Sequence, residues 1–255
     1  LAWLGRGGAP SMGQTIALPE FAVTTAAGDQ TAPAIEGSWV VWQDCDAAGC
    51  DLNGHNRLTG EYRTITTTTV ADLLHPAIGG EIVVWEDNQG ADADLYGYHV
   101  VTRQTFTVCV LAGDQRRPAT SGRFVAWEED GGGDVDLYGR DLSITETVRF
   151  PVVTAAGDQT HAAFAGDLVV WQDGRGGDVD IYARDLSTNT TPFPVVTMAG
   201  DQTHPAIDGR IVVWQDESSP TTGIDIWGHD LGSGQTFTIC TAPGDQTAPR
   251  IAGDI

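Results

Sequence analysis

The stretch "GDQTHPAIDGRIVVWQD" at residues 200–216 is repeated with few changes at 157–173 as "GDQTHAAFAGDLVVWQD". In each copy a Gly-Asp-Gln turn precedes a short segment, a glycine (Gly209 or Gly166) marks a second turn, and an unbroken apolar run ends in a tryptophan. A run that is apolar at consecutive positions is typical of a strand that is covered on both faces. The duplication therefore predicts a repeated β-unit.

The same unit extends along the whole chain with a period of about 43 residues. The aspartate of the turn, or the aspartate in its place, recurs at Asp29, Asp72, Asp114, Asp158, Asp201 and Asp245. The tryptophan that ends the apolar run recurs at Trp42, Trp85, Trp127, Trp171 and Trp214. Each unit divides into four short segments separated by turn residues, which is typical of the blade of a β-propeller.

We predict an all-β chain that forms one domain over residues 1–255, a six-bladed β-propeller of four-stranded antiparallel blades. Five blade units are expected at about 31–68, 74–111, 117–155, 161–198 and 204–241.

The sixth blade is predicted to be built from both termini, with 248–255 as its innermost strand and 1–25 as the other three. The reason is that "IAGDI" at 251–255 continues in register into "LAWLGRGG" at 1–8, as "FAGDL" continues into "VVWQDGRGG" at 164–177. Strand exchange between molecules would satisfy the same register and give a polymer. We expect closure within one chain, because its effective concentration is higher.

Units such as "HPAIDGRIVVWQD" followed by "DIWGHDL" resemble the TolB-like, WD-repeat-like propeller family over essentially the whole chain. The resemblance implies a six-bladed fold and a binding scaffold. The sequence departs from the family pattern in using "DG", "GG" or "AG" in place of the "SPDG" turn, and in lacking the amino-terminal domain of TolB. The particular partner of TolB is therefore not implied.

The chain is acidic, with 35 Asp and Glu against 13 basic residues, all of them arginine, and a formal charge of -22. This charge disfavours nucleic acid as a partner and favours cations or basic surfaces. No apolar run reaches about 18 residues, so we expect no membrane insertion.

Acidic residues are expected to gather on one rim, because the loop after the tryptophan and the Gly-Asp-Gln loop leave the blade on the same side. The predicted rim comprises Asp44, Asp46, Asp51, Glu86, Asp87, Asp92, Asp94, Glu128, Glu129, Asp130, Asp134, Asp136, Asp173, Asp178, Asp180, Asp216 and Asp225. Such carboxylates suit Ca²⁺, but no EF-hand-type loop occurs, and capping of turns explains their repetition equally. We therefore predict no bound cofactor and keep Ca²⁺ as the alternative.

Histidines occupy equivalent places near the start of the innermost strand at His75, His161 and His204. A metal site at the channel mouth is one interpretation. Equivalent positions on separate blades are too far apart for three imidazoles to reach one ion, so we expect packing or turn bonding instead.

Four cysteines raise two disulfide hypotheses. Cys45 and Cys50 lie close enough in one polar loop to form an intramolecular bridge, which would indicate an oxidising compartment. Cys109 and Cys240 are three blades apart, too far to pair within one ring, but they could link successive molecules. The alternative is a pair of half-buried thiols.

No nucleophile, zinc or phosphate-loop motif is present, so we predict no catalytic residues and no enzyme. The expected function is a scaffold for a protein partner or for copies of the chain itself, in a secreted, periplasmic or cell-surface setting. The alternative is a carbohydrate-binding or glycoside hydrolase-like propeller, with Trp39 and Trp227 as stacking surfaces.

Overall fold

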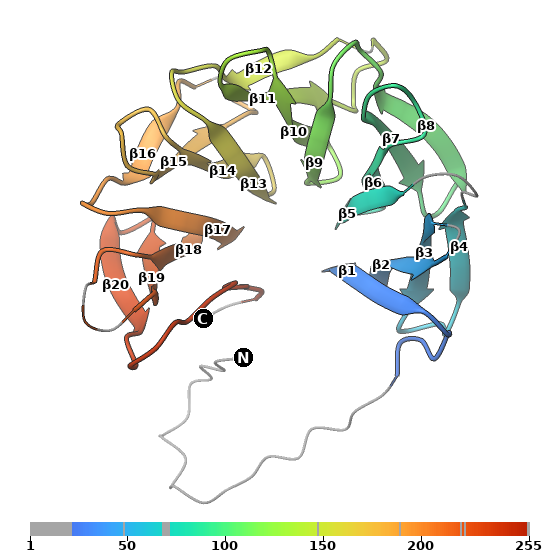
Figure 1. Cartoon of the computed structure of the whole chain (residues 1–255), viewed down its shortest axis with the longest axis horizontal. Helices are drawn as coiled ribbons and strands as arrows, with labels where there is room; N and C mark the ends of the chain where they lie inside the picture. The colour runs from blue at the N-terminus through green and yellow to red at the C-terminus, as the bar shows by residue number, and fades with distance from the viewer. Residues whose placement is uncertain are drawn as a thin grey trace, which may run out of the picture.

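The computed structural model describes residues 22–253, apart from 48, 68–71, 147, 189, 220 and 222. Within this part the chain is all β, with five four-stranded antiparallel sheets that follow one another along the sequence. The sheets are set radially around a common axis, with the first strand of each nearest the axis and the fourth at the periphery (Figure 1). This is the arrangement of propeller blades.

Each blade comprises four consecutive strands. The first blade comprises β1 (Asp29–Glu36), β2 (Trp39–Asp46), β3 (Gly49–Asn56) and β4 (Tyr62–Thr66). The second comprises β5 (Leu73–Gly79), β6 (Ile82–Asp87), β7 (Asp94–His99) and β8 (Gln104–Cys109). The third comprises β9 (Gln115–Thr120), β10 (Phe124–Asp130), β11 (Val135–Asp141) and β12 (Phe150–Val153). The fourth comprises β13 (Gln159–Ala165), β14 (Leu168–Asp173), β15 (Asp180–Asp185) and β16 (Phe193–Val196). The fifth comprises β17 (Gln202–Asp208), β18 (Ile211–Asp216), β19 (Asp225–Asp230) and β20 (Gln235–Cys240).

The second strand of each blade is the apolar run seen in the sequence. In β14, Val169, Val170 and Trp171 are all buried, because the third blade covers one face of the sheet and the fifth blade covers the other. Trp85, Trp127, Trp171 and Trp214 are at most 2% exposed, and each belongs to an apolar cluster shared with the blade before it.

Four such clusters fill the four interfaces between the five blades, listed here by one residue from each side: Val41 with Val83, Val84 with Val125, Ala126 with Val169, and Val170 with Val212. The core is therefore divided among the interfaces and has no single centre.

The described residues form five sheets, not the six that the sequence predicted. Of the predicted closing blade, residues 1–21, 254 and 255 lie outside the described residues. The remainder, 22–25 and 248–253, contains no strand, because no described segment pairs with it. The five blades form an arc with β1 on one side of the opening and the C-terminal segment on the other (Figure 1).

The described residues include no helix of the length and hydropathy that crossing a membrane requires.

Candidate functional site

Two kinds of loop share one face of the arc: the loop between the second and third strands of a blade, and the loop that leads into the next blade. The repeated aspartate joins them. The carboxylate of Asp114 accepts a hydrogen bond from the Ala93 amide at 2.9 Å, and Asp201 accepts one from the Val179 amide at 2.9 Å. Asp158 and Asp245 bond the corresponding amides of Val135 and Ile224, at 3.0 and 3.1 Å. The third, fourth and fifth blades and the C-terminal segment are thereby each tied to a loop of the blade before them. We call this side the loop face.

The glutamine after this aspartate fastens the same loop from within. Gln115, Gln159 and Gln202 are fully buried. The Gln202 side chain donates to the Gly200 carbonyl at 2.7 Å and accepts from the Met198 amide at 3.3 Å, and the other two copies repeat both bonds. A buried amide that satisfies backbone groups in this way holds the loop in one conformation.

The predicted acidic rim separates into exposed and buried carboxylates. Six of its members are at most 9% exposed: Glu86, Glu128, Asp173, Asp180, Asp216 and Asp225. The sequence pattern did not indicate this burial, because these residues lie near the end of the second strand or at the start of the third strand and not in the loop between them.

The exposed part of the rim keeps its charge close together. Asp134 accepts a bond from the Gly157 amide at 2.8 Å, and Asp130 accepts one from Gly132 at 2.7 Å. Burial, and then neighbouring carboxylates, raise the pKa of the half-buried Asp94 and Asp136. Neighbouring carboxylates on the rim therefore disfavour one another's charged form.

Two shallow hollows lie on the loop face between successive blades. One, of about 260 Å³, is lined by the 131–136 loop and by residues 154–156. The other, of about 220 Å³, lies between the 88–93 loop and Asp114 with Arg116. Within the described residues no group of three or more His, Cys, Asp or Glu side chains has the arrangement of a metal site.

At the inner edge of the loop face, each innermost strand carries a bulge whose first residue has a left-handed backbone. These five residues, and Ala248, which has the same backbone in the segment after β20, form the collar: Ala32, His75, Arg117, His161, His204 and Ala248, with φ between 46° and 55°. Sequence reasoning selected the three histidines but missed the bulge and Arg117. The sequence signal that identifies all six collar residues is their position, because each lies three residues after the repeated aspartate.

A second group of residues fixes the collar backbone, and two of its members, Glu86 and Glu128, were predicted to lie on the acidic rim. The residue after the tryptophan accepts a hydrogen bond from the collar amide of the next blade. Glu86 binds the Arg117 amide at 3.2 Å, Glu128 binds His161 at 2.9 Å, Gln172 binds His204 at 2.8 Å and Gln215 binds Ala248 at 2.7 Å. The occurrence of either Glu or Gln at this position in the sequence indicates such a role, because the feature that the two side chains share is an oxygen that accepts hydrogen bonds.

Collar side chains also contact one another. The Arg117 guanidinium lies 3.2 Å from Nε2 of His161, and the His161 and His204 rings are 4.9 Å apart between centroids. Burial, followed by the charges of Arg117 and His204, lowers the pKa of His161 to about 4. His161 is therefore neutral at physiological pH.

The cysteines occupy two different environments. Cys45 and Cys50 face each other across β2 and β3 and form a disulfide. Cys109 is a buried free thiol whose pKa burial raises to about 11, and Cys240 is a half-buried free thiol. The intermolecular link between Cys109 and Cys240 stays a prediction.

The two tryptophans considered as stacking surfaces pack within the protein. Trp39 lies against the cluster between the first two blades, with the Arg63 guanidinium 4.9 Å from its ring centroid, and Trp227 lies against the cluster between the fourth and fifth blades.

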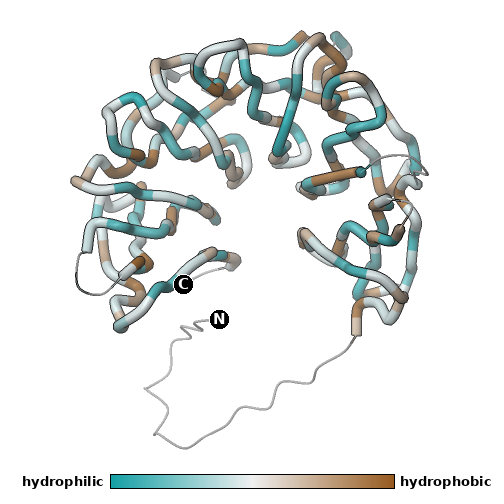
Figure 2. The backbone as a smooth tube through the Cα atoms, in the orientation of Figure 1, coloured by the Kyte–Doolittle hydropathy of each residue, from teal (hydrophilic) through white to brown (hydrophobic). Residues whose placement is uncertain are grey.

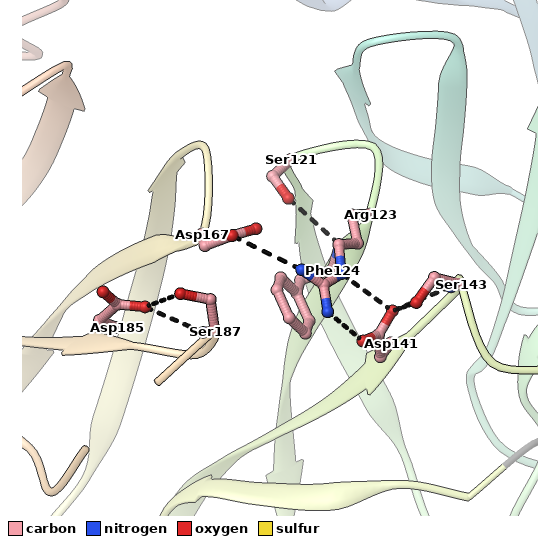
Figure 3. Close-up of polar contacts among 8 residues, drawn as sticks. All are labelled: Ser121, Arg123, Phe124, Asp141, Ser143, Asp167, Asp185 and Ser187. Atoms are coloured by element: carbon pink, nitrogen blue, oxygen red, sulfur yellow. Dashed lines mark hydrogen bonds and ion pairs between the residues drawn. The ribbon is translucent and has the colours of Figure 1, made fainter. Parts of the chain in front are cut away.

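On the face opposite the loop face, an arginine connects two neighbouring blades. Arg123 lies over the Phe124 ring at 4.5 Å and pairs with Asp141 of its own blade at 2.9 Å and with Asp167 of the next blade at 3.6 Å (Figure 3). These groups connect turns of the third and fourth blades and leave the loop face unaffected.

No model of a protein family and no curated protein matches the sequence. Solved structures do match. TolB from Acinetobacter baumannii superposes with a TM-score of 0.65 at 13% identity, over 89% of this chain and 58% of that chain. A TolB structure from Agrobacterium tumefaciens has a TM-score of 0.61 at 14% identity, over 85% and 82%. A chain of a nidogen/laminin complex has a TM-score of 0.57 at 14% identity, over 84% and 81%.

The chain also matches 39% of the length of puromycin hydrolase, with a TM-score of 0.65 at 13% identity. At these identities the likeness concerns the fold. The resemblance to TolB-like propellers that the repeat indicated is thereby confirmed, and the chain has the β-propeller fold of that family.

Proposed function

We propose that the protein is a non-catalytic scaffold that binds a protein partner with a basic surface through its loop face. The observation that carries this proposal is that hydrogen bonds fix the loops of that face. The repeated aspartates and buried glutamines fix the loops that lead into the third, fourth and fifth blades, and exposed carboxylates such as Asp130 and Asp134 lie beside these loops. A rigid, acidic surface loses little conformational entropy on binding.

The solved relatives support the same class of function, because a chain of a nidogen/laminin complex shares the fold. The net charge of -22 would steer a basic partner toward the protein and make the association rate fall with added salt.

A direct test uses a decapeptide of arginine as the probe, with calorimetric titration at about 0.05 and about 0.3 M salt. The rim variant Asp130→Asn with Asp134→Asn keeps the acceptor oxygens and removes two charges. The control, Glu81→Gln with Asp167→Asn, removes two charges from turns of the opposite face. We expect the rim variant to weaken binding several-fold more than the control. Equal losses would mean that only net charge matters.

We also propose that the ring is completed by a sixth blade built from 248–253 and the terminal segments 1–25 and 254–255. Residues 245–253 already make the contacts of an innermost strand: the Ala248 amide bonds Gln215, and the Gln246 amide bonds the Ile224 carbonyl at 2.7 Å. On the other side, Ile35 of β1 is 59% exposed, whereas Ile78 and Ile207 at the same repeat position are 8% and 7% exposed.

A matched pair of variants tests this closure. Ile207→Ala removes a buried side chain and is expected to cost about 2 to 5 kcal/mol. Ile35→Ala should cost a similar amount if a sixth blade covers β1, and well under about 1 kcal/mol if β1 stays open.

Light scattering after size exclusion then separates the two closures. A monomer supports closure within one chain, and a concentration-dependent series of oligomers supports strand exchange and self-assembly.

We propose a secreted, periplasmic or cell-surface location, supported by the Cys45–Cys50 disulfide. Thiol counting on protein isolated under alkylating conditions tests it. Four reactive thiols after unfolding would contradict the proposal, because the structure leaves only Cys109 and Cys240 free among its cysteines.

A further inference from the structure

The collar combines a fixed backbone with side chains that the backbone does not dictate. All six collar residues are left-handed, including Ala32 and Ala248, so the bulge itself needs no polar side chain. Yet four successive blades place His75, Arg117, His161 and His204 at this position. A non-glycine residue in this conformation costs about 1 kcal/mol or more. Since alanine fits the bulge, the run of ring and guanidinium groups requires another explanation.

These side chains make a continuous polar line around the axis. His75 contacts Glu86 at 3.1 Å, and the same Glu86 oxygen accepts the Arg117 amide. Arg117 reaches His161, which lies against His204. The innermost strands that carry them surround the centre of the ring, and Figure 2 shows β9, with Arg117, as a hydrophilic segment there.

Arg117 keeps its charge and most of its donors available. Among the described residues, its guanidinium has one hydrogen-bond partner, the Nε2 atom of His161. The other ring nitrogen of His161 lies 3.1 Å from the Thr160 hydroxyl. The neutral imidazole of His161 orients the Arg117 guanidinium without neutralising its charge. The guanidinium of Arg116, by contrast, lies 2.6 Å from the Asp114 carboxylate, which neutralises it.

The nearby carboxylates compensate Arg117 only in part. Glu86 is paired with His75, which lowers the pKa of Glu86 against the effect of burial. Glu128 is buried and bonded to the His161 amide, and burial raises its pKa. Neither carboxylate forms an ion pair with the Arg117 guanidinium in the described structure. The collar thus presents an oriented cation beside His161, with the exposed rings of His75 and His204 at other positions of the same collar.

We propose that the collar binds a carboxylate anion, held by the guanidinium of Arg117 beside His161. A planar guanidinium matches a carboxylate with two parallel hydrogen bonds. A monovalent carboxylate suits the site better than phosphate, because the acidic face around it repels a dianion more strongly. A metal ion is disfavoured by the adjacent guanidinium. This site does not depend on the proposed scaffold function.

The experiment follows the histidine ring signals of the whole chain by proton NMR while sodium acetate is added at constant ionic strength. Sodium chloride and inorganic phosphate are the parallel arms. His161→Asn and His204→Asn assign the signals. We expect saturable shifts of both signals with acetate and none with chloride.

Arg117→Gln is expected to weaken acetate binding about tenfold or more, as loss of a charge-assisted bidentate pair does. Arg116→Gln is the matched control, one residue away on the same strand, and should bind within about twofold of the parent. Arg117→Lys keeps the charge without the planar fork and should fall between them.

Several results would overturn the proposal: no saturable shift with acetate, equal weakening by Arg116→Gln and Arg117→Gln, or phosphate binding as tightly as acetate. Unchanged melting temperatures of the variants exclude misfolding as the cause of weaker binding. If Arg117→Gln does not fold, the comparison of Arg117→Lys with Arg116→Gln decides the question.

Discussion

The low pKa of His161 predicts a specific loss of stability in acid. Its pKa falls from the usual 6.5 to about 4 because burial, then Arg117 and His204, disfavour the charged ring. Between about pH 6.5 and about pH 4, the unfolded chain therefore binds a proton at His161 that the folded chain does not bind. Stability is fully present above about pH 6.5 and is lost as the pH falls toward about 4.

The size of the effect follows from the two pKa values. Their difference of about 2.5 units corresponds to at most about 3 kcal/mol at about 1.36 kcal/mol per unit, and because the His161 ring is only half-buried, solvent screening reduces the expected loss to about 1 to 2 kcal/mol. His161→Asn removes the titrating ring and keeps a residue type that tolerates the left-handed backbone. The variant should lose about 1 to 2 kcal/mol less than the parent between about pH 7 and pH 4.

Denaturant unfolding followed by tryptophan fluorescence at several pH values measures this difference. Carboxylates titrate in both proteins, so their contribution cancels when the two losses are subtracted. Arg117→Gln removes one cause of the low pKa and should give an intermediate loss. Parallel pH profiles of the parent and His161→Asn would refute the reasoning, because they would show that His161 protonates equally in the folded and unfolded chains.

Three further outcomes are expected. Gly97→Ala should destabilise the fold by about 1 to 3 kcal/mol in urea unfolding, because the added Cβ would lie 2.4 Å from the Phe106 ring; an unchanged midpoint would contradict that contact. Reduction of the Cys45–Cys50 disulfide should cost about 2 kcal/mol, measured by melting with and without reductant, since it closes a short loop. Gln202→Ala should cost about 1 to 3 kcal/mol and speed amide exchange in the loop before it, because the Gly200 carbonyl loses its buried donor; exchange at the parent rate would argue against that role.

The repeat in the sequence was sufficient to predict the blades. Trp171 and its equivalents mark the second strand because each fills the interface with the blade before it, and the steps between the tryptophans locate the other strands. The number of complete sheets was not predicted, since five are formed by the described residues and the closing blade depends on segments outside them.

The candidate site was predicted only in outline. Acidic residues do crowd the loop face, but Glu86 and Glu128 were assigned to its exposed part and are buried. The apolar run ends at the tryptophan while the strand continues beyond it, so hydropathy places the loop too early. The repeat marks the position of His161, but it does not indicate the left-handed backbone there, because a bulge is set by the pairing of two strands.

The directional pattern of bonds between successive blades has a consequence for rearranging the chain. In the third, fourth and fifth blades, the glutamate or glutamine after the tryptophan accepts a backbone bond from the segment that follows the blade, and the repeated aspartate accepts one from a loop of the blade before it. A unit excised or duplicated as a module must therefore carry both ends of this exchange, which places compatible junctions away from the Gly-Asp-Gln loops. New termini opened at the exposed turn between β19 and β20, around Gly232, would leave the exchange intact and give a permuted chain with the same neighbour contacts.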